Sequence, residues 1–387
     1  MIQRVDIGEN MKNVQLIRIK KNIQRYLYIN KWIKTSLFNV FYPFSSQKLT
    51  LKSNEAFEII NDMKAEPITS SIHENIIDKE CKYDLTIIIP AYNVSLYIDK
   101  CINSILSQKT TYKYKVLVVD DGSSDDTGKI IDSYKEDNRV LIIHQDNAGI
   151  SASRNRGLHH ISSNYIAFVD SDDYLPDNSI QKLLDAAYLN NADIVEGSHY
   201  RVYDKKLVKS MTHTDNISSS SNKLIGMPWG KVYKSVLFSK VVFPEKLRFE
   251  DSICTFLIYP QAHNIVTIAD YVYAYRIIGT SDSHLNANKK HQSLDTLWIT
   301  KLLIKEHEVL GLISDKEYSS SVIKQIVLNY HRMKKLPENV QKAAFVITSD
   351  VFRKYCLDLY FTENEQLLVD AIKALDYGRY KLYCLMN

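Results

Sequence analysis

Acidic side chains follow two apolar runs of the sequence, at positions where their carboxylates could bind a hard metal cation. Asp120 and Asp121 end the run YKVLVVDD, and Asp170-Ser171-Asp172-Asp173 ends or follows the run YIAFVD. Carboxylates gathered at strand ends repel one another unless a cation neutralises them. Mg²⁺ or Mn²⁺ would take one or two of them and complete its shell with water and the phosphates of a nucleotide diphosphate. The alternative is a solvated loop whose aspartates cap the next helix.

The run VVDDGSSDDTGKII (118–131) has the composition of a phosphate-binding P-loop, but its spacing excludes one. A P-loop that begins at Gly122 needs its second glycine at position 127, where Thr127 stands, and a Ser or Thr after its lysine. Lys129 is followed by Ile130, which has no hydroxyl to hold Mg²⁺. The aspartates of the run would also repel a triphosphate. We therefore assign the chemistry of this run to its aspartates and no role to Lys129.

Strands and helices alternate between residues 85 and 200, which predicts an α/β fold, a mostly parallel sheet with helices on both faces. Ligands bind outside the carboxyl ends of the strands in such a sheet. The polar groups at Pro90–Asn93, Asp120–Ser123 and Asp170–Asp173 should therefore meet at one edge. The predicted strands cover 85–89, 114–121, 139–144, 165–170 and 192–200, and the predicted helices cover 94–108, 125–136, 151–161 and 178–191.

The segments outside this alternation give weaker signals. Residues 45–83 are expected to form a linker with a helical patch near 55–63, and residues 201–224 a polar loop. From about residue 292 the apolar spacing is helical to the end of the sequence.

A basic segment precedes the linker. No acidic residue occurs between positions 11 and 54, and residues 11–44 mix lysines and arginines with aromatic and aliphatic side chains. This composition suits a helix on an anionic membrane surface, or equally a helical appendage that packs on its own protein with its lysines in water. Nucleic acid is not an expected partner, because the basic excess is local and the rest of the chain is acidic.

The five cysteines are odd in number and widely spaced, without a C-x-x-C pair, which argues for a reducing compartment and against zinc or disulfides. We find no apolar run that could span a bilayer and no signal peptide. The expected location is cytoplasmic, or peripheral on the inner face of the plasma membrane.

Several segments together resemble family 2 glycosyltransferases of the bacterial surface-polysaccharide type, which have the GT-A fold. The segments TIIIPAYNVSLYIDKCINSILSQ, VLVVDDGSSDDT, NAGISASRNRGL and YIAFVDSDDYLPDN match the nucleotide-sugar-binding half of that family in order and spacing. PWGKVYKSVLF, FPEKLRFEDSICTFLIY and YAYRIIGTSDS resemble its acceptor-side segments. The resemblance covers about residues 85–285, which it divides into the nucleotide-sugar half (83–200) and the acceptor half (201–285). An N-terminal extension and linker (1–82) and a C-terminal helical region (286–387) are expected outside it.

The resemblance also implies roles on the donor side. Asp121 would accept a hydrogen bond from the base N–H, which favours uracil, and Asp170 would contact the ribose or the metal's second shell. Asp172 would be the main ligand of Mn²⁺ or Mg²⁺, supported by Asp173. Arg154, in the first turn of its predicted helix, would reach the diphosphate or the base, or form an exposed ion pair with an aspartate. The base pocket would be lined by Pro90, Ala91 and Tyr92.

On the acceptor side, the resemblance makes Asp251 the base that deprotonates the attacking hydroxyl. One base opposite the leaving group inverts the anomeric carbon. Flanked by Glu250 in a partly dry site, Asp251 should have a raised pKa. The alternative is a pair of acids that cap a helix. Trp229 would stack on a sugar or close the pocket floor, although burial in the core is the commoner fate of a tryptophan.

Two further basic residues, Arg276 and His284, would reach the diphosphate or the metal from a flexible loop, the alternative for His284 being a surface histidine. The sequence therefore predicts an inverting transferase that moves a sugar from a UDP-sugar to a glycan acceptor, which the membrane-suited N-terminus suggests is lipid-linked. A nucleotidyltransferase is an alternative, but it needs a glycine-rich basic loop after the first strand, where PAYNVS has neither. A second alternative is a non-catalytic scaffold. The presence of both Asp172 and Asp251 argues against it.

Overall fold

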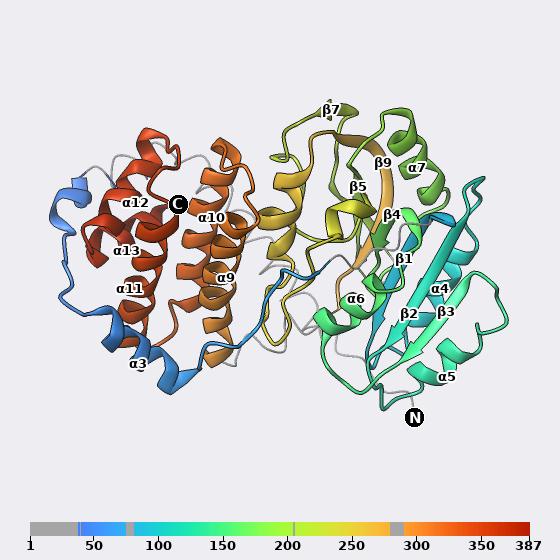
Figure 1. Cartoon of the computed structure of the whole chain (residues 1–387), viewed down its shortest axis with the longest axis horizontal. Helices are drawn as coiled ribbons and strands as arrows, with labels where there is room; N and C mark the ends of the chain where they lie inside the picture. The colour runs from blue at the N-terminus through green and yellow to red at the C-terminus, as the bar shows by residue number, and fades with distance from the viewer. Residues whose placement is uncertain (1–37, 39, 75–80, 204–205, 279–289) are drawn as a thin grey trace, which may run out of the picture.

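The protein consists of an α/β lobe and a helical lobe that lie side by side (Figure 1). The structure is a computed structural model that describes residues 38, 40–74, 81–203, 206–278 and 290–387. Most of the basic segment 11–44 lies outside these residues, so its expected membrane contact stays a prediction. None of the described helices is long and apolar enough to cross a bilayer.

The α/β lobe is built on one mixed sheet with the strand order β3-β2-β1-β4-β8-β5-β9-β7, and β6 pairs with β5. The first four strands in this order are parallel. The strand β1 is buried on both faces, because its run LTIIIPA is apolar apart from Thr86. The strands are β1 (Tyr83–Ala91), β2 (Tyr114–Asp120), β3 (Val140–His144), β4 (Ser163–Phe168), β5 (Ile194–Tyr203), β6 (Lys206–Met211), β7 (Asn216–Ser218), β8 (Lys231–Lys234) and β9 (Ile265–Arg276).

Helices cover both faces of the sheet, as the sequence predicts. Alternate side chains of β1 enter different hydrophobic cores, with Ile87 and Ile89 on one face and Ile88 on the other. The first core also holds the apolar sides of α4 (Ile98–Leu106), α5 (Thr127–Asp132) and α7 (Ser179–Leu189). The second holds the end of α6 (Ile150–Leu158) and continues into the helical lobe.

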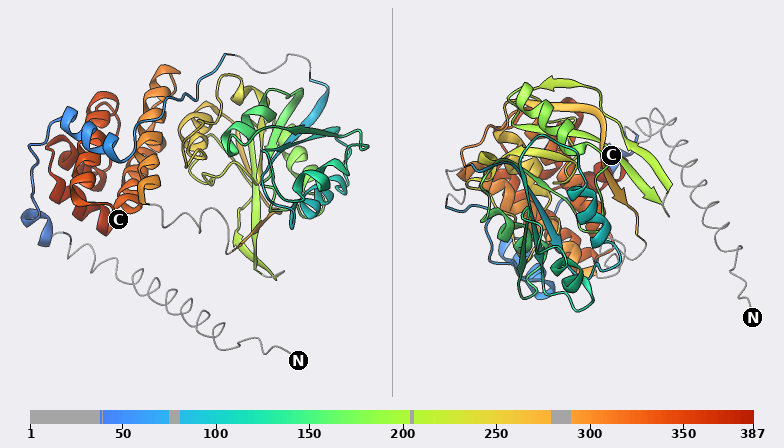
Figure 2. Two further views of the ribbon diagram at one scale, coloured as in Figure 1. Left: turned by 90° about the horizontal axis from the view of Figure 1, so that it is seen from below. Right: turned by 90° about the vertical axis from the view of Figure 1, so that its right-hand side faces the viewer.

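One local expectation was wrong. The polar loop expected over 201–224 contains β6 and β7, and β5 and β6 form a hairpin that projects from the sheet (Figure 2). β6 is exposed on both faces, so it lacks the apolar alternation that marks a half-buried strand. β8 pairs antiparallel with both β4 and β5 and lies between them in the sheet. α6 begins at Ile150, one residue before the predicted helix 151–161, and follows Gly149.

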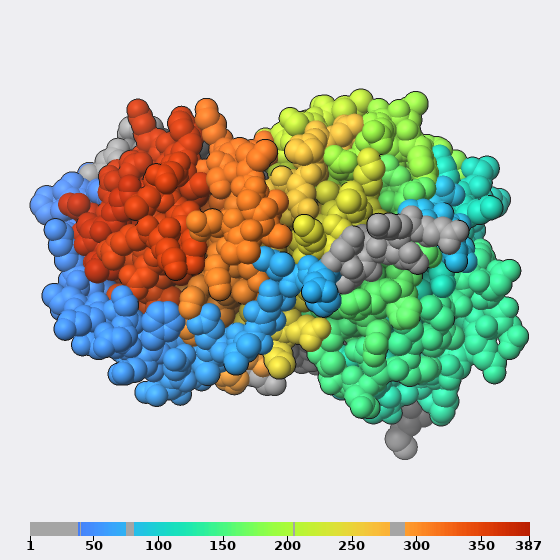
Figure 3. Space-filling view, in the orientation of Figure 1, coloured from blue at the N-terminus to red at the C-terminus, as the bar shows by residue number. Residues whose placement is uncertain are grey.

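The helical lobe confirms the helical pattern expected after residue 292. Residues 45–74, expected as a linker, instead pack along this lobe (Figure 3). α3 (Ser53–Met63) buries Ala56 and Ile60 against α11, and the Asp376 carboxylate accepts hydrogen bonds from Ser46 Oγ and Gln47 N. The lobe's own helices are α9 (Asp295–Val309), α10 (Lys316–Met333), α11 (Glu338–Tyr355), α12 (Glu363–Lys373) and α13 (Tyr377–Met386).

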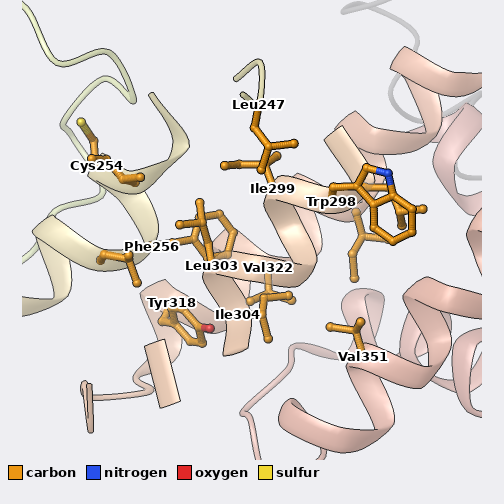
Figure 4. Packing of buried hydrophobic residues seen from close by; sticks show 14 of the residues in the cluster. Leu247, Cys254, Phe256, Trp298, Ile299, Leu303, Ile304, Tyr318, Val322 and Val351 are labelled. Atoms are coloured by element: carbon orange, nitrogen blue, oxygen red, sulfur yellow. The ribbon is translucent and has the colours of Figure 1, made fainter. Parts of the chain in front are cut away.

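One hydrophobic core joins the two lobes. The π-helical turn η3 (Cys254–Ile258) of the α/β lobe places Phe256 against Tyr318 of α10, with ring centroids 5.9 Å apart. Leu303 of α9 belongs to the same core (Figure 4). Because η3 follows Glu250-Asp251 directly, this packing fixes the helical lobe relative to the candidate catalytic pair.

Candidate active site

The polar ends of β1, β2 and β4 lie side by side, as the sequence predicts from the parallel topology. Ala91 at the end of β1 pairs with Asp120 of β2, and Ile88 of β1 pairs with Phe168 of β4. The Asp121 N–H donates to Ala91 O at 2.9 Å. Pro90 and Ala91 are buried, while Tyr92 is 49% exposed and open to a ligand at this edge.

Asp121 organises the turn that precedes α6. Its Oδ1 accepts from Gln145 Nε2 at 2.7 Å and from the Ala148 N–H at 2.9 Å, and its Oδ2 accepts from the Gly149 N–H at 2.8 Å. Gln145 was not among the candidate residues identified from the sequence. An ionised carboxylate offers about four acceptor positions. Three are used here, which leaves one on Oδ2 for a ligand N–H.

The three aspartates after β4 have different surroundings. Asp173 is fully buried, and its carboxylate accepts from Tyr273 Oη at 2.8 Å and from the Arg276 N–H at 2.6 Å. Asp170 pairs with Arg154. Burial, and then the charge of Asp170, raise the pKa of the Asp172 carboxyl to about 6. Within the described part of the chain, the Asp172 carboxylate has no ion-pair partner.

This arrangement fits one divalent cation bound chiefly by Asp172. No cluster of three or more acidic, histidine or cysteine ligands occurs among the described residues. Mg²⁺ sites that share the ion with substrate phosphates need only one or two carboxylates. Both Asp173 carboxylate oxygens already accept hydrogen bonds, from Tyr273 Oη and the Arg276 N–H, and its expected support of the metal stays a prediction.

Arg154 connects the two halves of the site. Its Nη2 donates to Asp170 Oδ1 at 3.0 Å and its Nη1 donates to Glu250 Oε1 at 2.8 Å. The ion pair with an aspartate, which the sequence offered as the alternative, is confirmed. The side chain is only 3% exposed and lies in the second turn of α6, so its expected exposure and its expected place in the first turn are wrong. Its guanidinium is thus committed to two carboxylates, one on each side of the site.

Glu250 and Asp251 follow a turn with an unusual backbone. Lys246 and Phe249 both have positive φ, 63° and 66°, although neither is glycine. Glu250 turns its carboxylate toward Arg154, so it does not cap the helical turn that follows. Burial, and then the charge of Glu250, raise the pKa of Asp251 to about 7, against the opposing charges of Arg332 and Arg154. The expected rise in the Asp251 pKa is confirmed.

The remaining sequence candidates have different outcomes. Trp229 is 5% exposed and stacks on Tyr273 with ring centroids 4.5 Å apart, so it is a core residue and does not present a face to a sugar. Arg276 Nε donates to Asp172 O at 2.6 Å, and its buried Nη2 has no hydrogen-bond partner among the described residues. His284 lies outside the described residues.

Comparison with known proteins agrees with the fold. A family model described as Glycosyl transferase family 2 matches residues 86–244. Glycosyltransferase GlyG of Streptococcus pneumoniae serotype 4 is 33% identical over 213 residues, which cover 50% of this chain and 70% of GlyG. The chain belongs to glycosyl transferase family 2. Membership in this family favours the transferase over the nucleotidyltransferase alternative.

Two further similarities show how much of the chain and of its relatives is shared. Glycosyltransferase GlyA of the same organism is 33% identical over 257 residues, 60% of this chain but only 35% of GlyA, so the chain spans about a third of that relative. The crystal structure of S. aureus TarS 1-349 in complex with UDP-GlcNAc has a TM-score of 0.62 at 20% identity and covers 77% of this chain and 89% of that one. This likeness shows the fold, and the predicted GT-A-type fold is confirmed.

Proposed function

We propose that the protein is an inverting glycosyltransferase that moves a sugar from a UDP-sugar to a hydroxyl of a glycan acceptor in surface polysaccharide assembly. The observation that carries this proposal is the Arg154 bridge. One buried guanidinium binds Asp170, beside the candidate cation ligand, and Glu250, beside the candidate base. Family membership supplies the reaction class, and the bridge brings the two required functions into one site.

The donor side suits a uridine nucleotide. The free acceptor position on Asp121 Oδ2 would receive the uracil N3–H, with Pro90, Ala91 and the exposed Tyr92 around the base. TarS, which shares the fold, was solved with UDP-GlcNAc and with UDP. Arg276 Nη2, which has no hydrogen-bond partner within the described part of the chain, would donate to the diphosphate.

Asp172 would hold Mn²⁺ or Mg²⁺ together with the diphosphate oxygens. A cation bound there supplies positive charge to the leaving diphosphate. On the opposite side, Asp251 Oδ would accept the proton of the acceptor hydroxyl as that oxygen attacks the anomeric carbon. A pKa of about 7 matches this task near neutral pH, where the carboxyl is both partly ionised and basic enough. A lipid-linked acceptor at the inner membrane face remains part of the proposal.

Thermal unfolding with UDP, GDP or CDP and Mn²⁺ tests the donor site. A ligand at a hundredfold excess over its Kd adds about 2.7 kcal/mol, which for a chain of this length raises the Tm by about 3 °C. We expect a shift with UDP that needs Mn²⁺ and disappears in Asp172→Ala. The matched control is Asp126→Ala, which removes an exposed carboxylate and should keep the shift. No shift with any nucleotide would refute the donor site.

A further inference from the structure

The helical lobe contacts the turn that carries the candidate base. Lys246 and Phe249 hold left-handed backbone conformations, which side-chain-bearing residues adopt only where neighbouring contacts impose them. Arg248 Nη1 donates to Gln292 Oε1 of the helical lobe at 2.7 Å. The Phe249 ring, directly before Glu250-Asp251, lies against Arg332 of α10, whose guanidinium carbon is 3.6 Å from the ring centroid. The strained turn is thus held from the opposite lobe at two points.

A buried polar network fixes Arg332. Its Nη1 donates to Thr296 Oγ1 at 2.9 Å. Thr296 Oγ1 donates in turn to Asn329 Oδ1 at 2.6 Å, and Gln325 Nε2 donates to the same oxygen at 2.9 Å. Thr296 and Asn329 are fully or almost fully buried. Side chains that satisfy one another in this way favour a single position of the guanidinium.

The charge of Arg332 acts on Asp251. The two groups are electrostatically coupled in both directions: Arg332 opposes the rise in the Asp251 pKa, and Asp251 opposes the fall that burial causes in the pKa of Arg332. Among the largest contributions to the Asp251 pKa, Arg332 is the one that comes from the helical lobe. The titratable groups that face Asp251 from all sides are Glu250, Arg154, Arg332, Cys254 and Tyr259.

We propose that Arg332 is a positioning residue of the active site: its guanidinium holds the Phe249 ring and brings a positive charge to Asp251, so that the helical lobe completes the catalytic centre. This inference rests on the proposed function of Asp251 as the base. It assigns a role to a lobe for which the sequence suggested none, and it makes activity depend on the packing of α10 against the turn at Phe249.

The test is the pH profile of sugar transfer by the full chain with Arg332→Gln, Arg332→Lys and the control Arg353→Gln, which changes a partly exposed arginine on α11. Loss of the positive charge lets the Asp251 pKa rise, so the acidic limb of kcat/KM should move up by about one pH unit in Arg332→Gln. Arg332→Lys retains the charge and should keep the limb, with a lower kcat because lysine lacks the flat guanidinium. The KM for the donor should stay unchanged in both.

Two results would overturn the inference. One is an Arg332→Gln enzyme that loses activity by the same factor at every pH, as a purely structural residue would. The other is a profile identical to that of the Arg353→Gln control. If Arg332→Gln does not fold, Arg332→Lys provides the test. A shift of about one pH unit in the acidic limb of the kcat/KM profile of Arg332→Lys would contradict the charge argument. Asp251→Asn separates the two proposals, because full activity in that variant would refute the proposed base itself.

Discussion

Replacing Asp251 by asparagine should abolish activity and yet stabilise the protein. Burial and Glu250 raise the Asp251 pKa from 3.8 to about 7. The folded carboxyl therefore holds its proton up to about pH 7, whereas the unfolded one releases it near pH 4. Binding of this proton stabilises the folded state in full at pH values below the unfolded pKa. The stabilisation is lost as the pH rises through the folded pKa.

The size of the effect follows from the shift. Each pKa unit is worth about 1.4 kcal/mol, so the penalty at pH 8 is about 4 kcal/mol at most. Asparagine carries no charge and avoids this penalty. At pH 8 the Asp251→Asn protein should melt up to about 5 °C above the parent, and the difference should shrink toward pH 4. Calorimetry at pH 4, 6 and 8 measures it.

The same shift predicts the pH dependence of the parent enzyme. A base with a pKa of about 7 is about one tenth ionised at pH 6, half ionised at pH 7 and about nine tenths ionised at pH 8. Initial rates of UDP release, measured with saturating donor and metal, should follow these fractions. Saturation keeps Asp172 bound to its cation, so its own titration does not enter. A rate that stays flat from pH 5 to 8, together with an Asp251→Asn protein that melts below the parent, would refute the reasoning.

Two further predictions concern parts of the fold that support the site. Lys231 and Glu196 form an ion pair with both side chains fully buried, so Lys231→Met should cost about 3–5 kcal/mol by chemical denaturation, and adding Glu196→Gln should recover part of it. An additive loss in the double variant would contradict the pairing. In Gly378→Ala the new methyl group would overlap the Ser45 carbonyl oxygen, so the segment around Ser45 should detach and become a site of limited proteolysis. Unchanged proteolysis would show that this segment does not depend on α13.

Much of the α/β lobe could be predicted from the sequence because its signals are local. Apolar runs such as LTIII and YIAFV mark buried strands, and the parallel topology then brings Asp121 and Asp172 to one edge. The rise in the Asp251 pKa could be predicted because a second carboxylate is adjacent in the sequence and the site was expected to be dry. Trp229 is buried in the core, which is the commoner position of a tryptophan.

Other features had no local signal. β8 lies in the sheet between β4 and β5, and its four residues, KVYK, are too few and too polar to mark a strand in the sequence. α3 reads as an ordinary amphipathic helix, and nothing near it in the sequence indicates that its partner is α11. The long-range pairing of such elements depends on which surfaces remain uncovered once the sheet has formed.

The sequence by itself determined the class of fold, the edge at which the site forms and the residue types that gather there, since strand periodicity and the order of parallel strands are properties of consecutive residues. Only the tertiary structure decided how those residues share their charges. In the folded chain Arg154 binds Asp170 and Glu250, and Asp173 is buried. Arg332, from a helix distant in the sequence, contacts the turn at Phe249. Such contacts join residues far apart in the chain, where spacing in the sequence carries no information about distance in space.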